Sequence, residues 1–167
     1  MLTGENYIGS SRSAEGTSIF ESTNPVTNEK LNKFYGATED EVNAAVEKAA
    51  AAFPAFSATT AEDRAAFLEA IGEEILNLGN DVIQTYCAES GLPEVRANGE
   101  RGRTVNQLKA FANYIKKENW KDEFLDEADS QREPLPKPQL LRTSVPIGPI
   151  AVFGASNFPF AFSTAGG

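Results

Sequence analysis

Residues 150–162 read IAVFGASNFPFAF, and this stretch decides the fold class. Ile150 to Phe153 form a short, all-apolar run, which is typical of a strand buried on both faces of a parallel sheet. Small and polar residues follow from Gly154 to Asn157, and Phe158-Pro159 favours the first turn of a helix. A strand, a loop and a helix in this order predict an α/β fold with a ligand crevice at the end of the strand.

An antiparallel pair of strands is expected upstream. β-prone residues occupy 18–23 and 31–35, and turn-forming residues separate the two runs. The first helix is expected to open at Thr38, because Thr38 and Glu41 have the spacing of a capping box, and to stop at Pro54.

Three more helices are predicted, over 60–78, 81–90 and 94–118. Two glycines inside the last of them cost about 1 kcal/mol each relative to Ala, so close approach of a neighbouring helix is the expected compensation. The stripe of this helix expected to face its neighbours holds Val95, Gly99, Gly102, Leu108, Ala112 and Ile115.

The composition changes after Trp120 and divides the chain. Residues 1–120 hold the strands and helices, and the acidic, proline-rich stretch 121–138 is expected to be a solvated connection. A strand is expected over 139–145, and residues 146–167 begin a second unit. Because a nucleotide-binding sheet takes at least two complete β-α-β units, this second unit is expected to be incomplete and the chain truncated.

The overall composition argues against several classes of function. The chain has 24 acidic and 15 basic residues and a formal charge of −9, which disfavours binding to nucleic acid or to an anionic membrane. It contains no histidine, the commonest general base and a frequent metal ligand, so no metal site is expected. The single cysteine, Cys87, forbids an internal disulfide, and no run approaches the ~20 apolar residues of a membrane span. We therefore expect a soluble, cytoplasmic protein.

The loop at 154–157 lacks the signatures of two common sites. It holds one glycine and is therefore not the dinucleotide fingerprint G-x-G-x-x-G. Ser156 lacks the closing glycine of a nucleophile elbow, and the chain has no histidine to activate it. For Asn157 the residues alone leave two interpretations open: its amide N–H stabilises a developing oxyanion, or its side chain caps the following helix.

Arginines of the fourth predicted helix also have two interpretations. Arg96, Arg101 and Arg103 lie within eight positions of one another and resemble an anion site. The alternative, which we favour, is that they pair with Glu94, Glu100 and neighbouring subunits.

Two regions, from Asn24 to Leu68 and from Val145 to Gly167, contain motifs in a register that extends along nearly the whole chain. The first region resembles the amino-terminal pattern of the aldehyde dehydrogenase superfamily, and the second is similar to the first strand and loop of that family's cofactor-binding domain. The resemblance covers about the first third of a family member. One branch is more similar still, the NADP-dependent α-ketoglutaric semialdehyde (2,5-dioxovalerate) and fatty aldehyde dehydrogenases, through Leu92 to Arg96, Gly99 to Thr104 and Pro134 to Pro138.

The resemblance implies the amino-terminal helices and oligomerisation strands of that fold, followed by the first strand of a Rossmann-like cofactor domain. It also implies oxidation of an aldehyde, a semialdehyde or a fatty aldehyde, to a carboxylic acid, with NADP as cofactor and NAD as the alternative. Asn157 takes the position of the family's oxyanion-stabilising asparagine. The nicotinamide ribose is expected along Phe153, Gly154, Ala155 and Ser156, and the substrate tunnel along Phe158, Ala161 and Phe162.

The resemblance further implies a homo-oligomer, a dimer or a tetramer, in which 139–145 and the amino-terminal strands form an oligomerisation sheet. The family's nucleophilic cysteine and glutamate base match no residue of this chain. Cys87 lies in a predicted helix between Tyr86 and Ala88 and is expected to be a packing residue. The chain alone is therefore expected to be inactive, and the alternative function is that of a non-catalytic assembly fragment.

Overall fold

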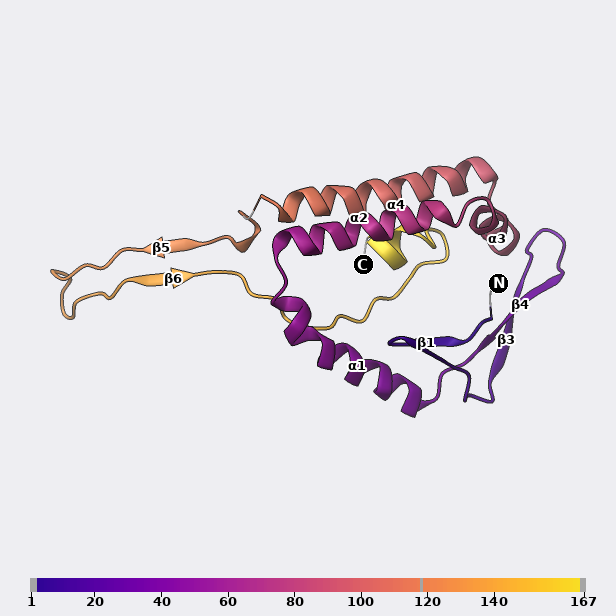
Figure 1. Cartoon of the computed structure of the whole chain (residues 1–167), viewed down its shortest axis with the longest axis horizontal. Helices are drawn as coiled ribbons and strands as arrows, with labels where there is room; N and C mark the ends of the chain where they lie inside the picture. The colour runs from indigo at the N-terminus through magenta and orange to yellow at the C-terminus, as the bar shows by residue number, and fades with distance from the viewer. Residues whose placement is uncertain (1–2, 118, 166–167) are drawn as a thin grey trace.

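The computed structural model describes residues 3–117 and 119–165 (Figure 1). It contains a helical layer, two amino-terminal hairpins, an extended arm, and a carboxyl-terminal segment that returns to the helices. In chain order the elements are β1 (Asn6–Ile8), β2 (Ser11–Ser13), β3 (Ile19–Thr23), β4 (Lys30–Tyr35), α1 (Glu39–Ser57), α2 (Ala61–Asn77), α3 (Asp81–Ser90), α4 (Glu94–Ile115), η1 (Asn119–Lys121), β5 (Phe124–Asp126), β6 (Leu140–Arg142) and η2 (Ala161–Ala165).

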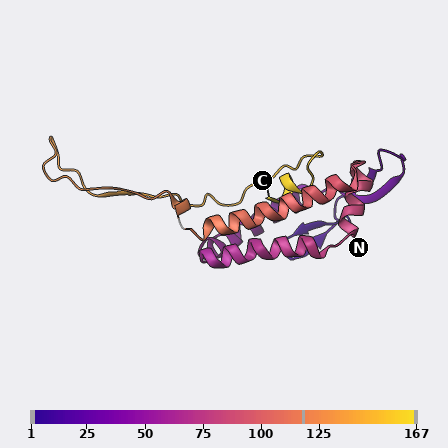
Figure 2. The same ribbon diagram turned by 90° about the horizontal axis from the view of Figure 1, so that it is seen from above.

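Helices α2 and α4 lie side by side and form the main layer of the molecule (Figures 1 and 2). Small residues permit this approach, since Ala65 of α2 and Ala112 of α4 are fully buried. Gly72 of α2 leaves room for Val105 of α4, because a Cβ atom at Gly72 would lie 3.4 Å from Cγ1 of that valine. The layer is therefore held by close packing of α2 on α4.

Helix α3 closes one end of this layer. Ile83 and Tyr86 of α3 pack with Ala97 of α4 in a buried cluster, and Cys87 is partly buried against it. The helix ends at Gly91, whose φ of 69° is the left-handed conformation that glycine adopts without a side-chain clash. The predicted span 81–90 is thus confirmed.

Two capping boxes begin α1 and α2 as predicted. The Glu41 backbone N–H donates to Thr38 Oγ1 at 3.1 Å, and the Asp63 N–H donates to Thr60 Oγ1 at 3.0 Å. The expected stop at Pro54 is wrong, because α1 continues through it to Ser57. A proline removes one backbone donor, and here only the last turn of the helix follows it.

The predicted packing role of two glycines in α4 is also wrong. A Cβ atom at Gly99 or Gly102 would meet no atom within 4 Å among the described residues. Val95, expected on the same stripe, is 80% exposed. Leu108 and Ala112 are buried as predicted, and the buried stripe of α4 holds Ala97, Glu100, Thr104, Val105, Leu108 and Ala112.

Two antiparallel hairpins precede the helices. β1 pairs with β2, and β3 pairs with β4 in a register that sets Phe20 opposite Phe34. The Ser22 hydroxyl of β3 donates to Glu89 Oε1 of α3 at 2.7 Å, and the Asn32 amide of β4 donates to the same oxygen at 3.1 Å. The expected strand pair over 18–23 and 31–35 is confirmed and is anchored to α3.

An arm formed by β5 and β6 extends away from the helices (Figures 1 and 2). Phe124 pairs with Arg142, and Lys137 donates to Asp126 Oδ1 at 2.7 Å. β6 lies within the predicted strand 139–145. The stretch 121–138, expected to be a connection, supplies β5, the other half of this hairpin.

The predicted strand Ile150–Phe153 is not paired with any described strand. Ile150 is 65% exposed and Phe153 is 91% exposed. A run of apolar residues becomes a strand only when a neighbouring strand accepts its backbone hydrogen bonds, and none of the described strands lies beside it.

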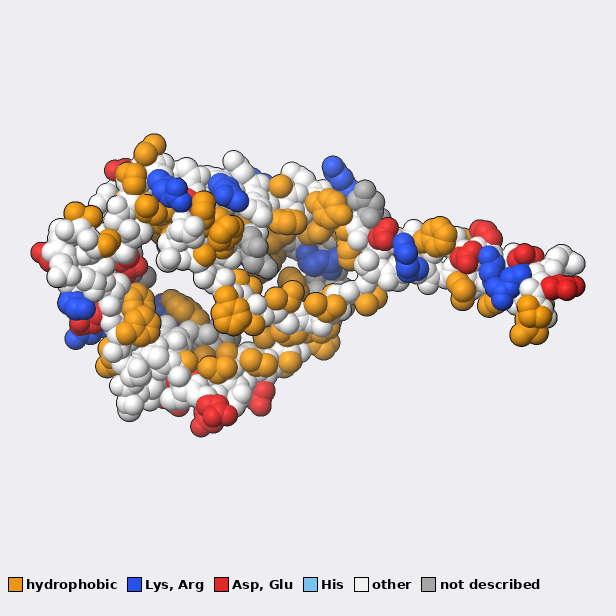
Figure 3. Space-filling model, turned by 180° about the vertical axis from the view of Figure 1, so that it is seen from behind, with side chains coloured by type: hydrophobic (Ala, Val, Ile, Leu, Met, Phe, Trp, Pro, Cys, Tyr) orange, Lys and Arg blue, Asp and Glu red, His pale blue; other side chains and the backbone are white. Residues whose placement is uncertain are grey.

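Apolar side chains border the hollow between α1 and the α2–α4 layer (Figure 3). On α1, Val42 and Val46 are more than half exposed. No helix within the described ranges combines the length and the apolar character needed to cross a membrane.

Candidate functional site

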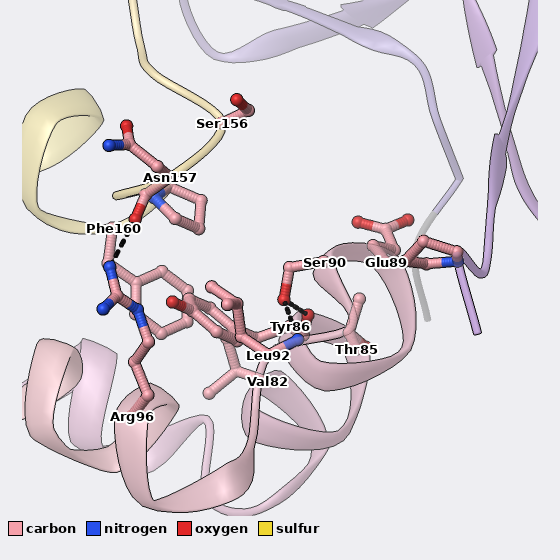
Figure 4. A pocket seen from close by; sticks show the side chains of 12 residues that line it. Val82, Thr85, Tyr86, Glu89, Ser90, Leu92, Arg96, Ser156, Asn157 and Phe160 are labelled. Carbon is pink, nitrogen blue, oxygen red and sulfur yellow. Dashed lines mark hydrogen bonds between the residues drawn. The ribbon is translucent and has the colours of Figure 1, made fainter.

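The segment from Ser156 to Phe160 forms a tight turn beside α3 and α4 (Figure 4). The Phe158 N–H donates to the Ala155 carbonyl at 3.1 Å, which closes the turn. The Phe160 ring packs on Tyr86 with ring centroids 5.1 Å apart. This aromatic contact attaches the predicted site loop to the buried cluster of α3 and α4.

A cavity of about 610 Å³ lies between this turn and α3. Its volume is within the range of small-molecule sites, and its wall combines apolar side chains with a few polar groups. Two predicted site residues, Ser156 and Asn157, lie on its wall. The residues that line it include Val82, Thr85, Tyr86, Leu92, Arg96, Ser156, Asn157 and Phe160.

Asn157 is exposed, and its side-chain amide points away from Tyr86 and Phe160 (Figure 4). Its backbone carbonyl accepts a hydrogen bond from Arg96 Nη2 at 3.0 Å. Within residues 3–117 and 119–165, no hydrogen bond involves the side-chain amide. The amide therefore does not cap the turn that follows it.

One of the two interpretations of Asn157 was that its side chain caps the following helix. Glu100 provides this capping in place of Asn157. Its Oε1 accepts the backbone N–H groups of Phe160 at 2.9 Å and of Ala161 at 3.1 Å. Its Oε2 accepts the Tyr86 hydroxyl at 2.7 Å. Glu100 is only 5% exposed, so three donors surround a buried carboxylate.

Tyr86 is held in its neutral form by this environment. Burial raises the pKa of its hydroxyl above 10.0, and the hydrogen-bonded Glu100 carboxylate raises it further. Tyr86 therefore remains a hydrogen-bond donor to Glu100 at neutral pH.

The arginines of α4 do not form the expected ion pairs with Glu94 and Glu100 among the described residues. Arg101 donates to the Gly79 carbonyl at 2.7 Å, so it binds the turn that follows α2. Arg96 and Arg103 instead lie over the Phe158 ring, at 4.9 and 5.4 Å from its centroid. Glu100 is not free for an arginine, because Tyr86 and the turn bind it.

The other predicted residues divide between exposed and packed positions. Phe153 and Gly154 are exposed, as is Ser156, whereas Ala155 is half-buried. Ala161 is buried, and the Phe158 and Phe162 rings lie 5.1 Å apart.

Glu100 is the residue that sequence reasoning misinterpreted. Its neighbours Arg101 and Arg103 favoured a surface ion pair. The useful signal was its spacing from Ala97, Thr104 and Leu108, which places it on the buried stripe of α4. An acid on such a stripe predicts buried hydrogen-bond donors facing it.

These elements define an α/β protein whose amino-terminal helices hold a loop beside a cavity, and the asparagine amide of this loop has no hydrogen-bond partner among the residues that the structure describes. Residues 11–166 match the aldehyde dehydrogenase family, and the chain belongs to this family. The resemblance of the motifs and the fold class are thereby confirmed.

Two semialdehyde dehydrogenases are similar in sequence. Alpha-ketoglutaric semialdehyde dehydrogenase 2 of Azospirillum brasilense is 44% identical over 168 residues, which cover 99% of this chain and 32% of the relative. Alpha-ketoglutaric semialdehyde dehydrogenase of Acinetobacter baylyi is 40% identical over 165 residues, covering 98% and 31%. The chain thus spans about a third of the length of these relatives.

Solved structures give the same fold. Aldehyde dehydrogenase 21 of Physcomitrella patens, in complex with the reaction product succinate, superposes with a TM-score of 0.79 at 27% identity, over 95% of this chain and 32% of its own. Succinate-semialdehyde dehydrogenase of Burkholderia pseudomallei gives a TM-score of 0.68 at 26% identity, and the match covers 75% of this chain and 26% of that enzyme. An NADP dependent enzyme of E. coli gives a TM-score of 0.60 at 26% identity, and the match covers 66% of this chain and 22% of that enzyme.

Proposed function

We propose that this chain is the amino-terminal part of an NAD(P)-dependent aldehyde dehydrogenase that oxidises a semialdehyde or a fatty aldehyde to a carboxylic acid. Membership of the family and the two semialdehyde dehydrogenase relatives support this activity. The observation that carries it is the side chain of Asn157, which stands beside the cavity without a hydrogen-bond partner among the described residues.

In this proposal Asn157 is the catalytic residue of the chain. When a thiolate attacks an aldehyde, the carbonyl oxygen gains negative charge, and the Asn157 amide donates an N–H to it. Such donors act best when they are oriented in advance, and removal of one costs roughly 10²–10³ in turnover. The lone cysteine, Cys87, is partly buried in α3, so the thiolate is expected to come from another part of the full-length enzyme.

The substrate is proposed to contact Phe158, Ala161 and Phe162. The two phenylalanine rings lie 5.1 Å apart. Ala161 is a buried residue of the same segment.

NADP is the proposed cofactor, with NAD as the alternative. The nucleotide supplies a hydride acceptor when bound. Phe153, Gly154, Ala155 and Ser156 would hold its nicotinamide ribose, mainly through backbone groups. An extended, largely exposed backbone with two small residues fits this role, because no bulky side chain at Gly154 or Ala155 blocks it. The NADP dependence of the E. coli relative supports the choice.

A second candidate function, assembly without catalysis, is favoured by one observation. The arm exposes Leu125, Leu140 and Leu141 at 47%, 54% and 62%. Apolar side chains on a two-stranded hairpin are stabilised by association with another copy. The proposed homo-oligomer, a dimer or a tetramer in the cytoplasm, would bury them.

The decisive experiment measures nucleotide reduction by a full-length aldehyde dehydrogenase that carries these residues. With α-ketoglutaric semialdehyde as substrate, Asn157→Ala is expected to lower kcat by roughly 10²–10³. A variant that retains the parent kcat would remove Asn157 from the mechanism. The 167-residue chain alone is expected to give no turnover above a protein-free blank, and turnover by it would contradict the proposed division of catalytic groups.

A further inference from the structure

Two side chains of α4 bind opposite ends of the turn that carries Asn157. Arg96 Nη2 donates to the Asn157 carbonyl at 3.0 Å. Glu100 Oε1 accepts the N–H groups of Phe160 and Ala161, at 2.9 and 3.1 Å. Arg96 and Glu100 are four positions apart in one helix, so they project from the same face.

We propose that Arg96 and Glu100 are positioning residues that fix Asn157 for oxyanion stabilisation. This inference rests on the proposed function. Neither side chain touches the reacting atoms in the proposal, and both act through the backbone around Asn157. Together these two residues form the α4 clasp.

The Glu100 half of the clasp is the stronger one. Its carboxylate is buried and accepts three hydrogen bonds, from two backbone N–H groups and from Tyr86 Oη. Hydrogen bonds to a charged acceptor are roughly twice as strong as neutral ones. Movement of the turn would remove two of the three donors from a buried charge, with Tyr86 Oη as the remaining donor among the described residues, and this penalty holds Phe160 and Ala161 in place.

The Arg96 half is more exposed, but its guanidinium is restrained by two contacts. It lies 4.9 Å from the centroid of the Phe158 ring while it donates to the Asn157 carbonyl. Both contacts are with residues that follow one another in the turn. Arg96 therefore fixes the Asn157 backbone relative to α4, and its exposure predicts a smaller contribution than that of Glu100.

The clasp leaves the Asn157 side chain available. The helix binds the Asn157 carbonyl and the N–H groups three and four residues later, while the amide points away from Tyr86 and Phe160 (Figure 4). An oxyanion donor needs this arrangement, because a displacement of about 1 Å can lower a rate by about 10².

The first test is amide hydrogen exchange on the 167-residue chain. Glu100→Ala is expected to accelerate exchange at Phe160 and Ala161, whereas Glu100→Gln retains an acceptor oxygen and restores most of the protection. Glu94→Gln is the matched control, since Glu94 is an exposed acid of the same helix. Unchanged exchange at both amides in Glu100→Ala, with the α2–α4 amides still protected, would overturn the clasp.

The second test measures kinetics in a full-length aldehyde dehydrogenase carrying these residues. Glu100→Ala is expected to lower kcat by about 10- to 100-fold while the KM for nucleotide stays within about twofold. Glu100→Gln should recover part of the loss, and Arg96→Met should lower kcat by less than Glu100→Ala. A merely structural role would lower the amount of folded enzyme and leave kcat per active site unchanged.

The outcomes separate the two proposals. If Asn157→Ala loses activity but Glu100→Gln, Glu100→Ala and Arg96→Met all retain the parent kcat, the clasp is overturned and the proposed function stands. If the parent enzyme oxidises no aldehyde, the proposed function fails, and the catalytic part of the clasp fails with it. Hydrogen exchange still decides whether Glu100 holds the turn.

Discussion

The α2–α4 layer and the segment 143–165 show how differently two regions of one chain are stabilised. The layer has a capping box at the start of α2, fully buried residues such as Ala65 and Ala97, and a close contact at Gly72. The segment exposes most of its apolar side chains, and among the described residues its hydrogen bonds to the layer lie between Asn157 and Ala161. Local signals specify the first region, whereas long-range hydrogen bonds to α4 specify the second.

The largest expected difference in stability comes from truncating one apolar side chain to Ala in each region. Ile83→Ala removes a fully buried side chain of α3, where this helix packs on the end of the layer, and should lower the free energy of unfolding by about 2–5 kcal/mol. Phe153→Ala removes a larger side chain that is 91% exposed and should change it by less than about 0.5 kcal/mol. Urea unfolding of the two variants measures the difference. Equal losses would show that Phe153 packs in solution.

Helix capping gives the next largest effect. Thr60→Ala removes the acceptor of the Asp63 N–H and should destabilise the chain by about 1 kcal/mol. Thr143→Ala, an exposed threonine of the carboxyl-terminal segment, is the control and should be close to neutral. A neutral Thr60→Ala would mean that packing on α4, and not the cap, defines the start of α2.

The helices illustrate what could be predicted from the sequence. Thr38, Thr60 and Gly91 act on backbone groups within four residues, so the local pattern contains both partners of each interaction. Pro54 was a misleading stop signal because one missing hydrogen bond near the end of a helix is tolerated. The boundaries of helices were therefore less predictable than their existence.

The candidate site could be predicted only in part. The resemblance selected Asn157, and its role remains a prediction. Glu100 acts on N–H groups 60 and 61 residues away, and no local pattern contains that distance. The state of Ile150–Phe153 depends on neighbouring strands, which an apolar run cannot specify by itself.

Substitution of two glycines in the layer by Ala is expected to change stability by smaller amounts, and the two substitutions are expected to differ in their effect. Gly99→Ala should stabilise the chain by about 0.5–1 kcal/mol, because α4 gains helix propensity and the new methyl group meets no neighbour among the described residues. Gly72→Ala should gain less or lose stability, since its Cβ would lie 3.4 Å from Val105. Thermal unfolding of both variants tests this order. A destabilising Gly99→Ala would show that this face of α4 is covered in solution.

The smallest expected effect concerns acid stability at the start of α1. Hydrogen bonds from the Ser13 hydroxyl and the Thr38 backbone lower the pKa of Glu41 from 4.5 to about 2. Because the folded pKa is depressed, the stabilisation is complete above pH 4.5 and is lost as the pH falls towards 2.

Glu41→Gln should therefore lower the urea midpoint near neutral pH, and its difference from the parent should shrink between pH 4.5 and 2. Glu123→Gln, an exposed acid before β5, should give no such pH-dependent difference, because no ion pair or hydrogen bond among the described residues involves its side chain. If the Glu41→Gln difference persisted unchanged at pH 2, the stabilisation would come from the shape of this side chain and not from its charge. Packing alone would then explain the difference in stability between the layer and the more exposed segments.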